Sequence, residues 1–335
     1  MEMKMKVYRH TQLGDMSTLK IRDEALTSVG SGQVLVRVQA SSLNFRDIII
    51  AQGHYPFGIV ENHVPLSDGA GVIEAVGDGV RRFAVGDRVM SSFFPDWFGG
   101  RIPAHREQYQ KEHDGWLTEY RVISAEALTT VPDHLTFEEA SALPCAALTG
   151  WSAVSGVGPG DTVLTLGAGG VSLSAIQFAK ALGARVIATT SSSDKFEKLT
   201  ALGADALINY RETPDWHQAV RDLTGGLGAD RIVEVGGPAT IAQSVRSIRE
   251  GGQVSIVGAL GMEGEAIDIM KLFFSQATYK VISVGNRNDL EEMNRAVAAH
   301  QIRPVIDSVF AFEDAHSAYE RLGSRNVFGK VVIRN

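Results

Sequence analysis

The chain has 335 residues, of which 44% are hydrophobic and 21% charged, and its formal net charge is −7. At this length a single hydrophobic core usually divides, so two domains are expected, and the acidic balance argues against a nucleic-acid or anionic-membrane partner. The one cysteine, Cys145, excludes an internal disulfide, and no apolar stretch resembles a signal peptide or a transmembrane helix, so a cytoplasmic protein is expected.

The first part of the chain, residues 1–125, has the pattern of a mostly β module. Short apolar runs are separated by Gly-Asp turns, which is typical of strands joined by tight connections. Residues 93–116 are irregular and rich in aromatic, histidine, proline and glycine residues, which predicts a surface loop or lid whose His105 and His113 face solvent. The expected strands are Gln33–Ala40, Gly69–Val76, Asp87–Met90 and Leu117–Val122.

After residue 125 the pattern changes to alternating strands and helices. Leu-Gly-Ala triplets at 182–184, 202–204 and 227–229 each follow a helix-like stretch and precede an apolar run, so each glycine is expected to close a helix. Such short connections predict right-handed crossovers and a parallel sheet with helices on both faces. The expected strands are Arg185–Thr190, Ala206–Asn209, Arg231–Val235 and Gln253–Val257.

Helix starts in this region are also marked by sequence. Thr136 with Glu139 has capping-box spacing and predicts a helix between the two modules. Asp194 has the same spacing to Glu197, and Pro214 is expected at the first position of a helix. The end of the chain, residues 329–333, predicts a strand that returns to the β module.

A glycine-rich turn follows the buried strand Thr162–Leu166. Strand, glycine turn and amphipathic helix in this order predict a pyrophosphate site, because the glycines allow close approach of the backbone and the helix start supplies free N–H groups. Ser172 stands where a third glycine or alanine is usual and is small enough to keep the helix near the strand. The residues expected at the cofactor are Gly167, Gly169, Gly170 and Val171.

The end of the second strand favours NADPH over NADH. An NAD site normally has an acidic residue at this strand tip to bind the adenosine ribose. Here the strand ends in threonine and serine residues followed by Lys195, and these groups suit a 2′-phosphate. Asp194 is interpreted as a helix cap rather than as the ribose-binding acid.

Six short motifs lie outside the glycine turn: Leu43–Asp47, Gly53–Pro56, Asp68–Ile73, Val85–Val89, Leu143–Trp151 and Ile208–Arg211. Together they resemble the medium-chain dehydrogenase/reductase superfamily, in particular its zinc-independent quinone-reductase and enoyl-reductase-like branch. The resemblance covers nearly the whole chain. It implies an α/β fold with a GroES-like, mostly β catalytic domain (1–125 and 286–335), a Rossmann dinucleotide-binding domain (126–285), and an active site in the cleft between them. It also implies a homodimer, with Tyr279–Val284 as the candidate edge strand.

The resemblance assigns further residues to the cofactor. Ser191 or Ser192, Lys195 and Tyr210 match the residues that hold the 2′-phosphate of NADPH in quinone reductases of this branch. Thr149 resembles a threonine that contacts the nicotinamide, although an ordinary helix hydroxyl is the alternative. Gly236 and Gly237 are expected to let the backbone pass close to the nicotinamide, or else to form only a structural turn.

Zinc-dependent members of the superfamily hold their catalytic metal with a cysteine, a His-Glu pair and a second cysteine. The corresponding positions are Asn44, Ser67-Asp68 and Cys145. Catalytic zinc needs about three ligands of the cysteine, histidine or carboxylate type, so no zinc is expected. Cys145 is interpreted as a small, buried helix residue.

Without a Lewis acid, a small electrophile such as a quinone or an α,β-unsaturated carbonyl is the expected substrate, because conjugation spreads the incoming charge. Asn44 is a candidate to bind the cofactor or a substrate carbonyl, with a turn-capping role as the alternative. Tyr55 resembles the tyrosine that enoyl-thioester reductases place near the substrate as proton donor or anchor, and its alternative is packing. Arg46 and Asp47 are expected to pair with each other or to cap the following helix.

The leading hypothesis is therefore an NADPH-dependent oxidoreductase that transfers a hydride to a quinone or an α,β-unsaturated carbonyl without a metal. A zinc-independent, NADP-linked alcohol dehydrogenase is the second hypothesis. The third is a crystallin-like protein that binds NADPH without turnover.

Overall fold

The computed structural model describes residues 4–335 except 259 and 262. It divides into two compact units, of which the second comprises Thr149–Val284 and the first contains the chain before and after that segment. The α/β architecture confirms the expected fold class. None of the helices in the described part of the chain is long and apolar enough to cross a membrane.

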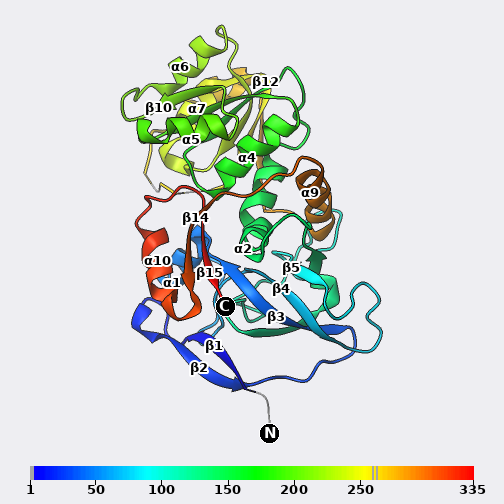
Figure 1. The fold of residues 1–335 in the computed structure, drawn as a ribbon. Coiled ribbons are helices and arrows are strands. Elements are labelled where there is room, and N and C mark those ends of the chain that lie inside the picture. Colours follow the sequence, from blue (N-terminus) through cyan, green and yellow to red (C-terminus); the bar gives the residue numbers. More distant parts are fainter. Residues whose placement is uncertain (1–3, 259, 262) are drawn as a thin grey trace. The chain divides into compact units, whose positions relative to one another are not determined.

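The first unit is built on a seven-stranded sheet (Figure 1). The strand order is β14-β15-β3-β4-β5-β7, and β6 pairs with β3. The C-terminal strand β15 pairs antiparallel with β3, so the chain end returns to this sheet as expected. The strands are β3 (Gln33–Ser42), β4 (Asp68–Val76), β5 (Arg88–Ser91), β6 (Tyr120–Ser124), β7 (Leu128–Thr130), β14 (Ile306–Ala311) and β15 (Lys330–Arg334).

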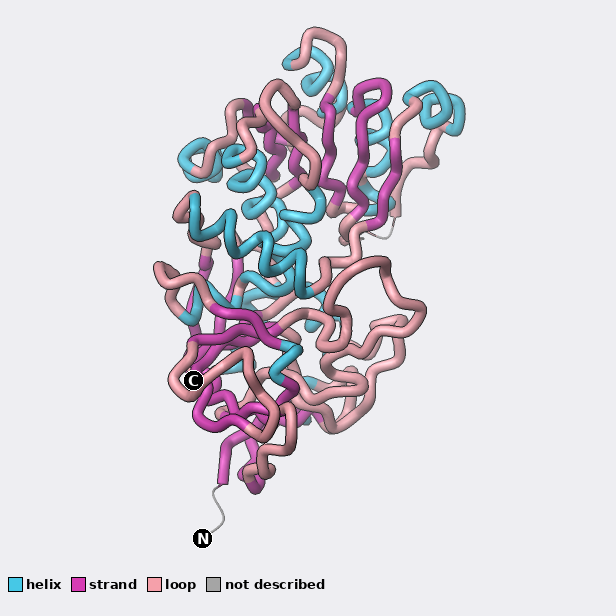
Figure 2. Tube along the Cα trace, turned by 90° about the vertical axis from the view of Figure 1, so that its right-hand side faces the viewer, coloured by secondary structure: helices cyan, strands magenta, loops and turns pink. Residues whose placement is uncertain are grey.

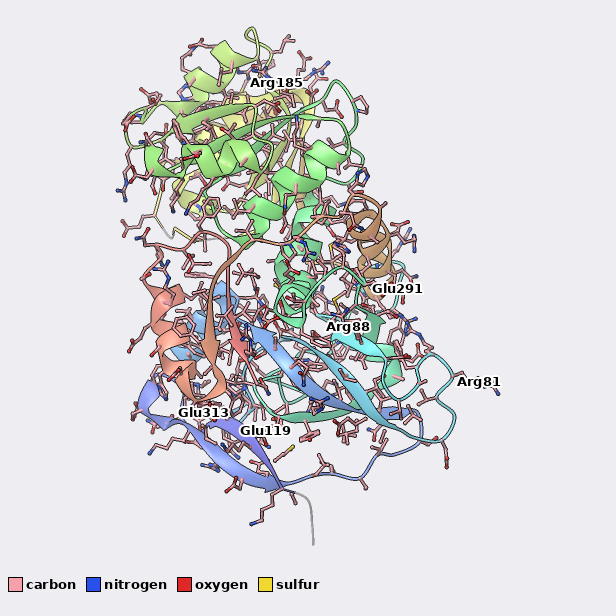
Figure 3. The ribbon with its side chains drawn as sticks, in the orientation of Figure 1. Arg81, Arg88, Glu119, Arg185, Glu291 and Glu313 are labelled. Atoms are coloured by element: carbon pink, nitrogen blue, oxygen red, sulfur yellow. The ribbon has the colours of Figure 1, made fainter. Side chains whose placement is uncertain are left out.

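A separate antiparallel pair, β1 (Lys4–His10) and β2 (Leu19–Ala25), precedes the sheet. Glu119 and Glu313, both labelled in Figure 3, bind Lys6 of β1 through its backbone N–H and its ammonium group respectively. The hairpin is thereby attached to segments from both ends of the first unit's sequence.

The helices of the first unit begin where the sequence supplies caps. The hydroxyl of Thr136 accepts from the N–H of Glu139, whose carboxylate accepts from the N–H of Thr136, so the predicted capping box is confirmed. The α-helices are α1 (Phe45–Ala51), α2 (Phe137–Ser141), α9 (Arg287–Ala299) and α10 (Ala315–Gly323); shorter turns are η1 (Met16–Thr18), η2 (Ala125–Ala127), the π-helical η3 (Leu143–Ala147) and η6 (Phe312–Asp314).

The boundary between the units lies later in the chain than the expected residue 125. Helix α2 packs against β3 and β4, and η3 packs against β4. These contacts keep residues 126–148 with the first unit, and the second unit begins at Thr149.

The segment 93–116 is an irregular loop, as its composition predicts, but part of it is buried rather than at the surface. Tyr109 and Trp116 are completely buried and pack with β3, and a Cβ at Gly69 would overlap the Trp116 ring. The carbonyls of Trp97 and Phe98 accept from the first N–H groups of α9. The segment is therefore anchored to both the sheet and a helix start.

The two histidines of this segment differ from each other. His105 is exposed, as predicted. The His113 side chain is 35% exposed, so it reaches solvent in part, and its Nε2 lies 2.6 Å from the carboxylate of Glu107.

The second unit is a six-stranded parallel sheet with the order β10-β9-β8-β11-β12-β13. Figure 2 shows helices on both sides of these strands. Gly183 and Gly203 have positive φ and directly follow the C-caps of α4 and α5, as predicted for glycines that end helices. Gly228 also has positive φ, but α6 ends at Leu223 and is closed by Gly225 and Gly226, so the prediction that Gly228 ends a helix is wrong. The strands are β8 (Thr162–Leu166), β9 (Arg185–Thr190), β10 (Ala206–Asn209), β11 (Ala229–Glu234), β12 (Ile248–Ile256) and β13 (Thr278–Val281). The helical segments are α3 (Leu148–Ala153), α4 (Gly170–Ala181), η4 (Ser193–Lys195), α5 (Phe196–Ala201), α6 (Trp216–Leu223), η5 (Gly237–Ala239), α7 (Ile241–Ser247) and α8 (Ile269–Ser275).

Two predicted helix starts are wrong. Ser192, not Asp194, caps the chain after β9, because its hydroxyl accepts from the N–H of Asp194 and begins η4. Asp215, not Pro214, immediately precedes α6, so the proline lies outside the helix. In both cases the sequence predicts a helix in the correct segment, and the predicted first residue of the helix differs from the observed one by two residues or fewer.

His10 and His63 pack against each other inside the first unit. Their ring centroids are 6.0 Å apart, and the side chains are 2% and 5% exposed. His63 Nδ1 lies 2.7 Å from the carbonyl oxygen of Val60. Burial lowers the pKa of both histidines, that of His63 to about 4. Both side chains are therefore neutral in the folded protein at pH 7.

We expect His63→Gln to reduce the acid sensitivity of the fold. Between pH 6.5 and 4 the unfolded chain binds a proton at His63 that the folded chain does not. The free energy of unfolding is therefore highest above pH 6.5 and falls by about 3 kcal/mol as the pH is lowered to 4. Urea unfolding at pH 7 and pH 4 measures this loss. His105→Gln, at an exposed position, should keep the wild-type loss, and the same loss in His63→Gln would contradict the prediction.

Candidate active site

The glycine turn of the second unit has the geometry of a phosphate cradle. Gly167 has a φ of +75°, and a Cβ at Gly167 or Gly169 would meet no atom within 4 Å among the described residues. Gly169 is the N-cap of α4 and has no side chain to bind the first N–H groups of the helix. N–H groups at a helix start, with the positive end of the helix dipole, favour an anion such as a pyrophosphate.

Ser172 has a specific role in this turn. Its hydroxyl donates a 2.6 Å hydrogen bond to the carbonyl of Leu166, the last residue of β8. The bond ties the first turn of α4 to the strand end. The sequence argument considered only the small size of Ser172. The structure shows that its hydroxyl also forms a hydrogen bond, which glycine or alanine could not form.

The ends of β9 and β10 bring together the residues assigned to the adenosine end of the cofactor. Thr190 pairs with Asn209, and the N–H of Tyr210 donates to the carbonyl of Thr190. Ser191 and Tyr210 therefore leave the sheet side by side, and Lys195 follows in η4. Tyr210 is 40% exposed.

Two polar residues at this edge were missed by the sequence argument. The amide of Asn209 donates to the Ser193 hydroxyl at 3.0 Å and to the Glu212 carboxylate at 2.7 Å. An acidic group thus lies beside the serine run, although it comes from the turn after β10 rather than from the tip of β9. The hydroxyl of Ser192 is engaged with Asp194, both as acceptor and as donor.

The turn after β11 is organised by a buried carboxylate. Glu234 is completely buried and accepts from the N–H groups of Gly236 and Gly237 at 2.8 and 3.0 Å. It also accepts from the hydroxyls of Thr240 and Ser244. The turn itself requires both glycines, because a Cβ at Gly236 would overlap Thr240 and Gly237 has a φ of +69°. An acid at the end of a buried parallel strand was the available signal, and the sequence argument did not use it.

The four positions that correspond to zinc ligands lie together in the first unit. Asp68 Oδ1 accepts from the Ser67 hydroxyl at 2.8 Å, and Oδ2 accepts from Asn44 Nδ2 at 2.9 Å and from the Cys145 N–H at 3.2 Å. Lys330 of β15 completes the group, donating from Nζ to the carbonyl of Leu43 and to Asn44 Oδ1 at 2.6 and 2.5 Å.

A lysine thus supplies the positive charge at these positions. Lys330 Nζ lies 3.8 Å from Asp68 Oδ2, and the two side chains are 6% and 0% exposed. Burial raises the pKa of Asp68, and the Lys330 ammonium opposes that shift. The amide of Asn44 is held at both ends, with its oxygen toward Lys330 and its nitrogen toward Asp68.

These residues do not fit a zinc ion. Asn44 and Ser67 are not of the usual ligand types, and both oxygens of Asp68 are occupied by hydrogen bonds. Burial raises the pKa of the Cys145 thiol well above its ordinary value, which disfavours the thiolate that zinc binds. Cys145 is partly exposed, so its prediction as a fully buried residue is wrong. No group of three potential metal ligands occurs anywhere in residues 4–335, leaving out 259 and 262.

The other residues of this neighbourhood lie on α1 and after it. The Asp47 carboxylate accepts from the N–H of Asn44 and from Gln110 Nε2, each at 2.7 Å, so it caps α1. No ion pair between Arg46 and Asp47 is present within 4.0 Å; instead Arg46 Cζ lies 5.0 Å from the ring centroid of Tyr55. The sequence left open whether Arg46 and Asp47 pair with each other or cap the helix. The structure confirms the capping role for Asp47.

Thr149 is in the second unit, at 4% exposure on α3. The predicted residues thus gather in two places. Asn44 and Tyr55 lie in the first unit. Thr149, the glycines, the serines, Lys195 and Tyr210 lie in the second.

Two family models match the chain. The alcohol dehydrogenase GroES-like domain matches residues 30–133, and the zinc-binding dehydrogenase domain matches residues 170–299. A zinc-type alcohol dehydrogenase-like protein of Schizosaccharomyces pombe is 38% identical over 99% of both chains. An acryloyl-coenzyme A reductase of Sulfurisphaera tokodaii is 29% identical over 91% of this chain and 93% of its own. The crystal structure of an NAD-dependent alcohol dehydrogenase is similar with a TM-score of 0.92 and 34% identity, covering 98% of this chain and 99% of that chain.

We expect Lys330→Met to lower the free energy of unfolding by about 3–5 kcal/mol, because the substitution leaves the buried Asp68 carboxylate without its cation. Urea unfolding measures the loss, and the double variant Lys330→Met/Asp68→Asn should recover part of it. Lys180→Met is the control, since its ion pair with Asp205 is on the surface and should contribute no more than about 1 kcal/mol. Equal losses for both lysines would show that the buried ion pair is not the stabilising feature.

Proposed function

The chain belongs to the medium-chain dehydrogenase/reductase superfamily, and we propose that it is an NADPH-dependent reductase of quinones or α,β-unsaturated carbonyl compounds that works without a metal. The nicotinamide cofactor, when bound, supplies the hydride. The glycine turn and the start of α4 hold its pyrophosphate, and residues of the first unit bind the electrophile.

One observation carries the proposal: the positions of the zinc ligands are filled by the hydrogen-bonded group of Lys330, Asn44 and Asp68. Without a Lewis acid, little stabilises the alkoxide of an unactivated alcohol. A quinone or an enone spreads the incoming charge over its conjugated system, so well-placed hydrogen bonds are sufficient. The similarity to an acryloyl-coenzyme A reductase, whose named substrate is an α,β-unsaturated thioester, supports this substrate class.

Two residues of the first unit receive roles in the proposal. Tyr55 is the candidate proton donor or anchor for the substrate oxygen. Asn44 is reassigned from a direct ligand contact to a positioning role, because its amide is bound at both ends by Lys330 and Asp68. It joins β15 to the start of α1 and keeps both charged residues in place.

For the cofactor we propose NADPH, held at its 2′-phosphate by Lys195 and Tyr210 together with Ser191. Ser192 contributes less, since its hydroxyl is bound to Asp194. Glu212 near Ser193 and the similarity to an NAD-dependent alcohol dehydrogenase favour NADH instead. We place NADPH first because the acid comes from the turn after the neighbouring strand, whereas the residue at the strand tip is a serine.

An alcohol dehydrogenase is the second candidate function. It is favoured by the similarity to the zinc-type alcohol dehydrogenase-like protein of Schizosaccharomyces pombe and to the NAD-dependent enzyme. A protein that binds NADPH without turnover is the third candidate, and the substrate panel below distinguishes all three.

We also propose a homodimer formed through β13, the edge strand of the second unit's sheet. The edge and the nearby helix α8 carry apolar side chains in solvent: Ile269 is 68%, Phe273 70%, Phe274 65% and Val281 69% exposed. An unpaired edge strand beside an apolar patch is a site for self-association, and a twofold axis would let each copy cover the same surface of the other.

The function is tested with purified protein and a panel of a small enone, a benzoquinone and a secondary alcohol, each with both nicotinamide cofactors. We expect NADPH oxidation with the enone or the quinone, zinc well below one atom per chain, and unchanged rates after chelation. Alcohol oxidation that is lost on chelation would contradict the proposal. Tight NADPH binding with no turnover would identify the third candidate.

The cofactor assignment is tested with Lys195→Ala. Loss of one charge-assisted contact to the 2′-phosphate costs about 1.5–3 kcal/mol, so the Kd for NADPH should rise about ten- to a hundred-fold. The Kd for NADH should change little, because NADH lacks that phosphate. Lys198→Ala, one lysine further along the chain, should leave both values near those of the wild type. Equal weakening of NADH and NADPH by Lys195→Ala would sink the assignment.

A further inference from the structure

Arg46 places a positive charge inside the first unit, and no described carboxylate or carbonyl oxygen accepts a hydrogen bond from it. Its Nε, Nη1 and Nη2 atoms are all shielded from solvent and have no hydrogen-bond partner. Within the described part of the chain it is the one arginine for which all three guanidinium nitrogens are in this state. A buried charged group without partners costs several kcal/mol, so its retention requires a compensating function.

Aromatic rings hold the guanidinium in place, and Tyr55 also raises the pKa of Arg46 as a charged and hydrogen-bonding neighbour. Arg46 Cζ lies 5.0 Å from the ring centroid of Tyr55 and 5.2 Å from that of Phe93. Stacking on ring faces of this kind stabilises a cation and leaves the fork of five N–H donors directed elsewhere.

The nearest acid does not neutralise this fork. Asp47 is fully buried, but its oxygens accept from the Asn44 N–H and from Gln110. Burial alone would lower the pKa of Arg46, and Tyr55, Asp47 and Cys145 raise it on balance, so the side chain keeps its charge. Cys145 contributes to the raised pKa of Arg46, so the two residues lie near each other. The Cys145 N–H binds the Asp68 carboxylate, and Arg46 is therefore also near the group built around Asp68. Tyr319 on α10 is the remaining titratable group that interacts with Arg46.

We propose that Arg46 is the oxyanion-binding residue of the substrate site, donating hydrogen bonds to the carbonyl oxygen of an α,β-unsaturated carbonyl or a quinone. The proposal rests on the proposed reductase function and names the group that recognises the substrate. Tyr55, whose ring faces the same guanidinium, lies beside the oxygen that Arg46 would bind.

The charge balance explains why a cation is useful there. The β-carbon of the substrate accepts the hydride pair, the C=C π pair moves to form a bond between the α-carbon and the carbonyl carbon, and the carbonyl π pair moves onto oxygen. The enolate oxygen then carries the negative charge opposite Arg46. A proton added at the α-carbon restores the carbonyl, and NADPH, the reductant named above, leaves as NADP⁺. A preorganised donor in a water-poor site stabilises such an oxyanion more strongly than water does.

The test uses Arg46→Met, which keeps side-chain length and removes the charge, and Arg46→Lys, which keeps the charge and removes the fork. Enone turnover should fall about 10²- to 10³-fold in Arg46→Met, the usual effect of removing one oxyanion donor, and less in Arg46→Lys. The Kd for NADPH should stay within about two-fold of the wild type, because the residues proposed to hold its phosphates are unchanged. Unchanged enone turnover in an active Arg46→Met protein would overturn the inference and leave the reductase function intact.

Arg88→Met is the matched control. Arg88, labelled in Figure 3, also lies over an aromatic ring, 4.7 Å from that of Phe137, but its guanidinium donates to the carbonyls of Asp133 and Leu135. Enone turnover should therefore be unaffected. A fall in Arg88→Met as large as that in Arg46→Met would show a general effect of removing stacked arginines and would also overturn the inference.

Two further measurements do not depend on turnover. Benzoate, a carboxylate that cannot be reduced, should bind the protein in the presence of NADP⁺, and calorimetry should show this binding lost in Arg46→Met. The urea midpoint of Arg46→Met should be equal to or above that of the wild type, because an unpartnered buried charge is removed. A lower midpoint with benzoate binding retained would mean that Arg46 is structural. Benzoate binding that depends on Arg46 would support the site even if no enone or quinone in the panel were reduced.

Discussion

The contact on which the first unit depends is the buried hydrogen-bonded chain from Lys330 through Asn44 to Asp68. It joins the last strand, the start of α1 and the first residue of β4, three segments that are far apart in the sequence. Each group satisfies another, so a cation and a carboxylate are tolerated in an interior where either alone would be strongly unfavourable. The same hydrogen bonds occupy the Asp68 oxygens that a metal ion would need as ligands. One interaction therefore both stabilises the first unit and disfavours a metal at these positions.

A positive charge is present in this region as ammonium and guanidinium groups. Lys330 is fully engaged with Asp68, Asn44 and the chain itself, and serves to hold the group together. Arg46 is held by ring faces, and its hydrogen-bond donors meet no described carboxylate or carbonyl oxygen. This division of tasks, with one cation structural and the other available, is what a site for an oxyanion requires, because a donor that is already satisfied by the protein adds little to binding.

The second unit positions its cofactor groups mainly through the backbone. Gly167 and Gly169 leave open space at the start of α4, Ser172 ties that helix to β8, and Glu234 holds the turn after β11. Because Glu234 accepts from four donors in one turn, that turn is rigid before any ligand arrives. Preorganisation of this kind lowers the entropy lost on binding. It makes the glycines at 236 and 237 structural elements of the site, whatever contact their backbone makes with a ligand.

The sequence by itself determined the features that are local or periodic. The order of strands and helices after residue 160, the helix-ending glycines at 183 and 203, and the Thr136 capping box all follow from spacing along the chain, because helix ends and strand periodicity depend on neighbouring residues. Residue types alone also argued against zinc at positions 44 and 67. Only the tertiary structure decided which partners the buried polar groups take: Lys330 with Asn44, Glu234 with its own turn, Arg46 with aromatic rings, and residues 93–116 with the start of α9. Such partners come from segments separated by tens to hundreds of residues, and no local pattern records which of them the packed core brings within hydrogen-bond distance.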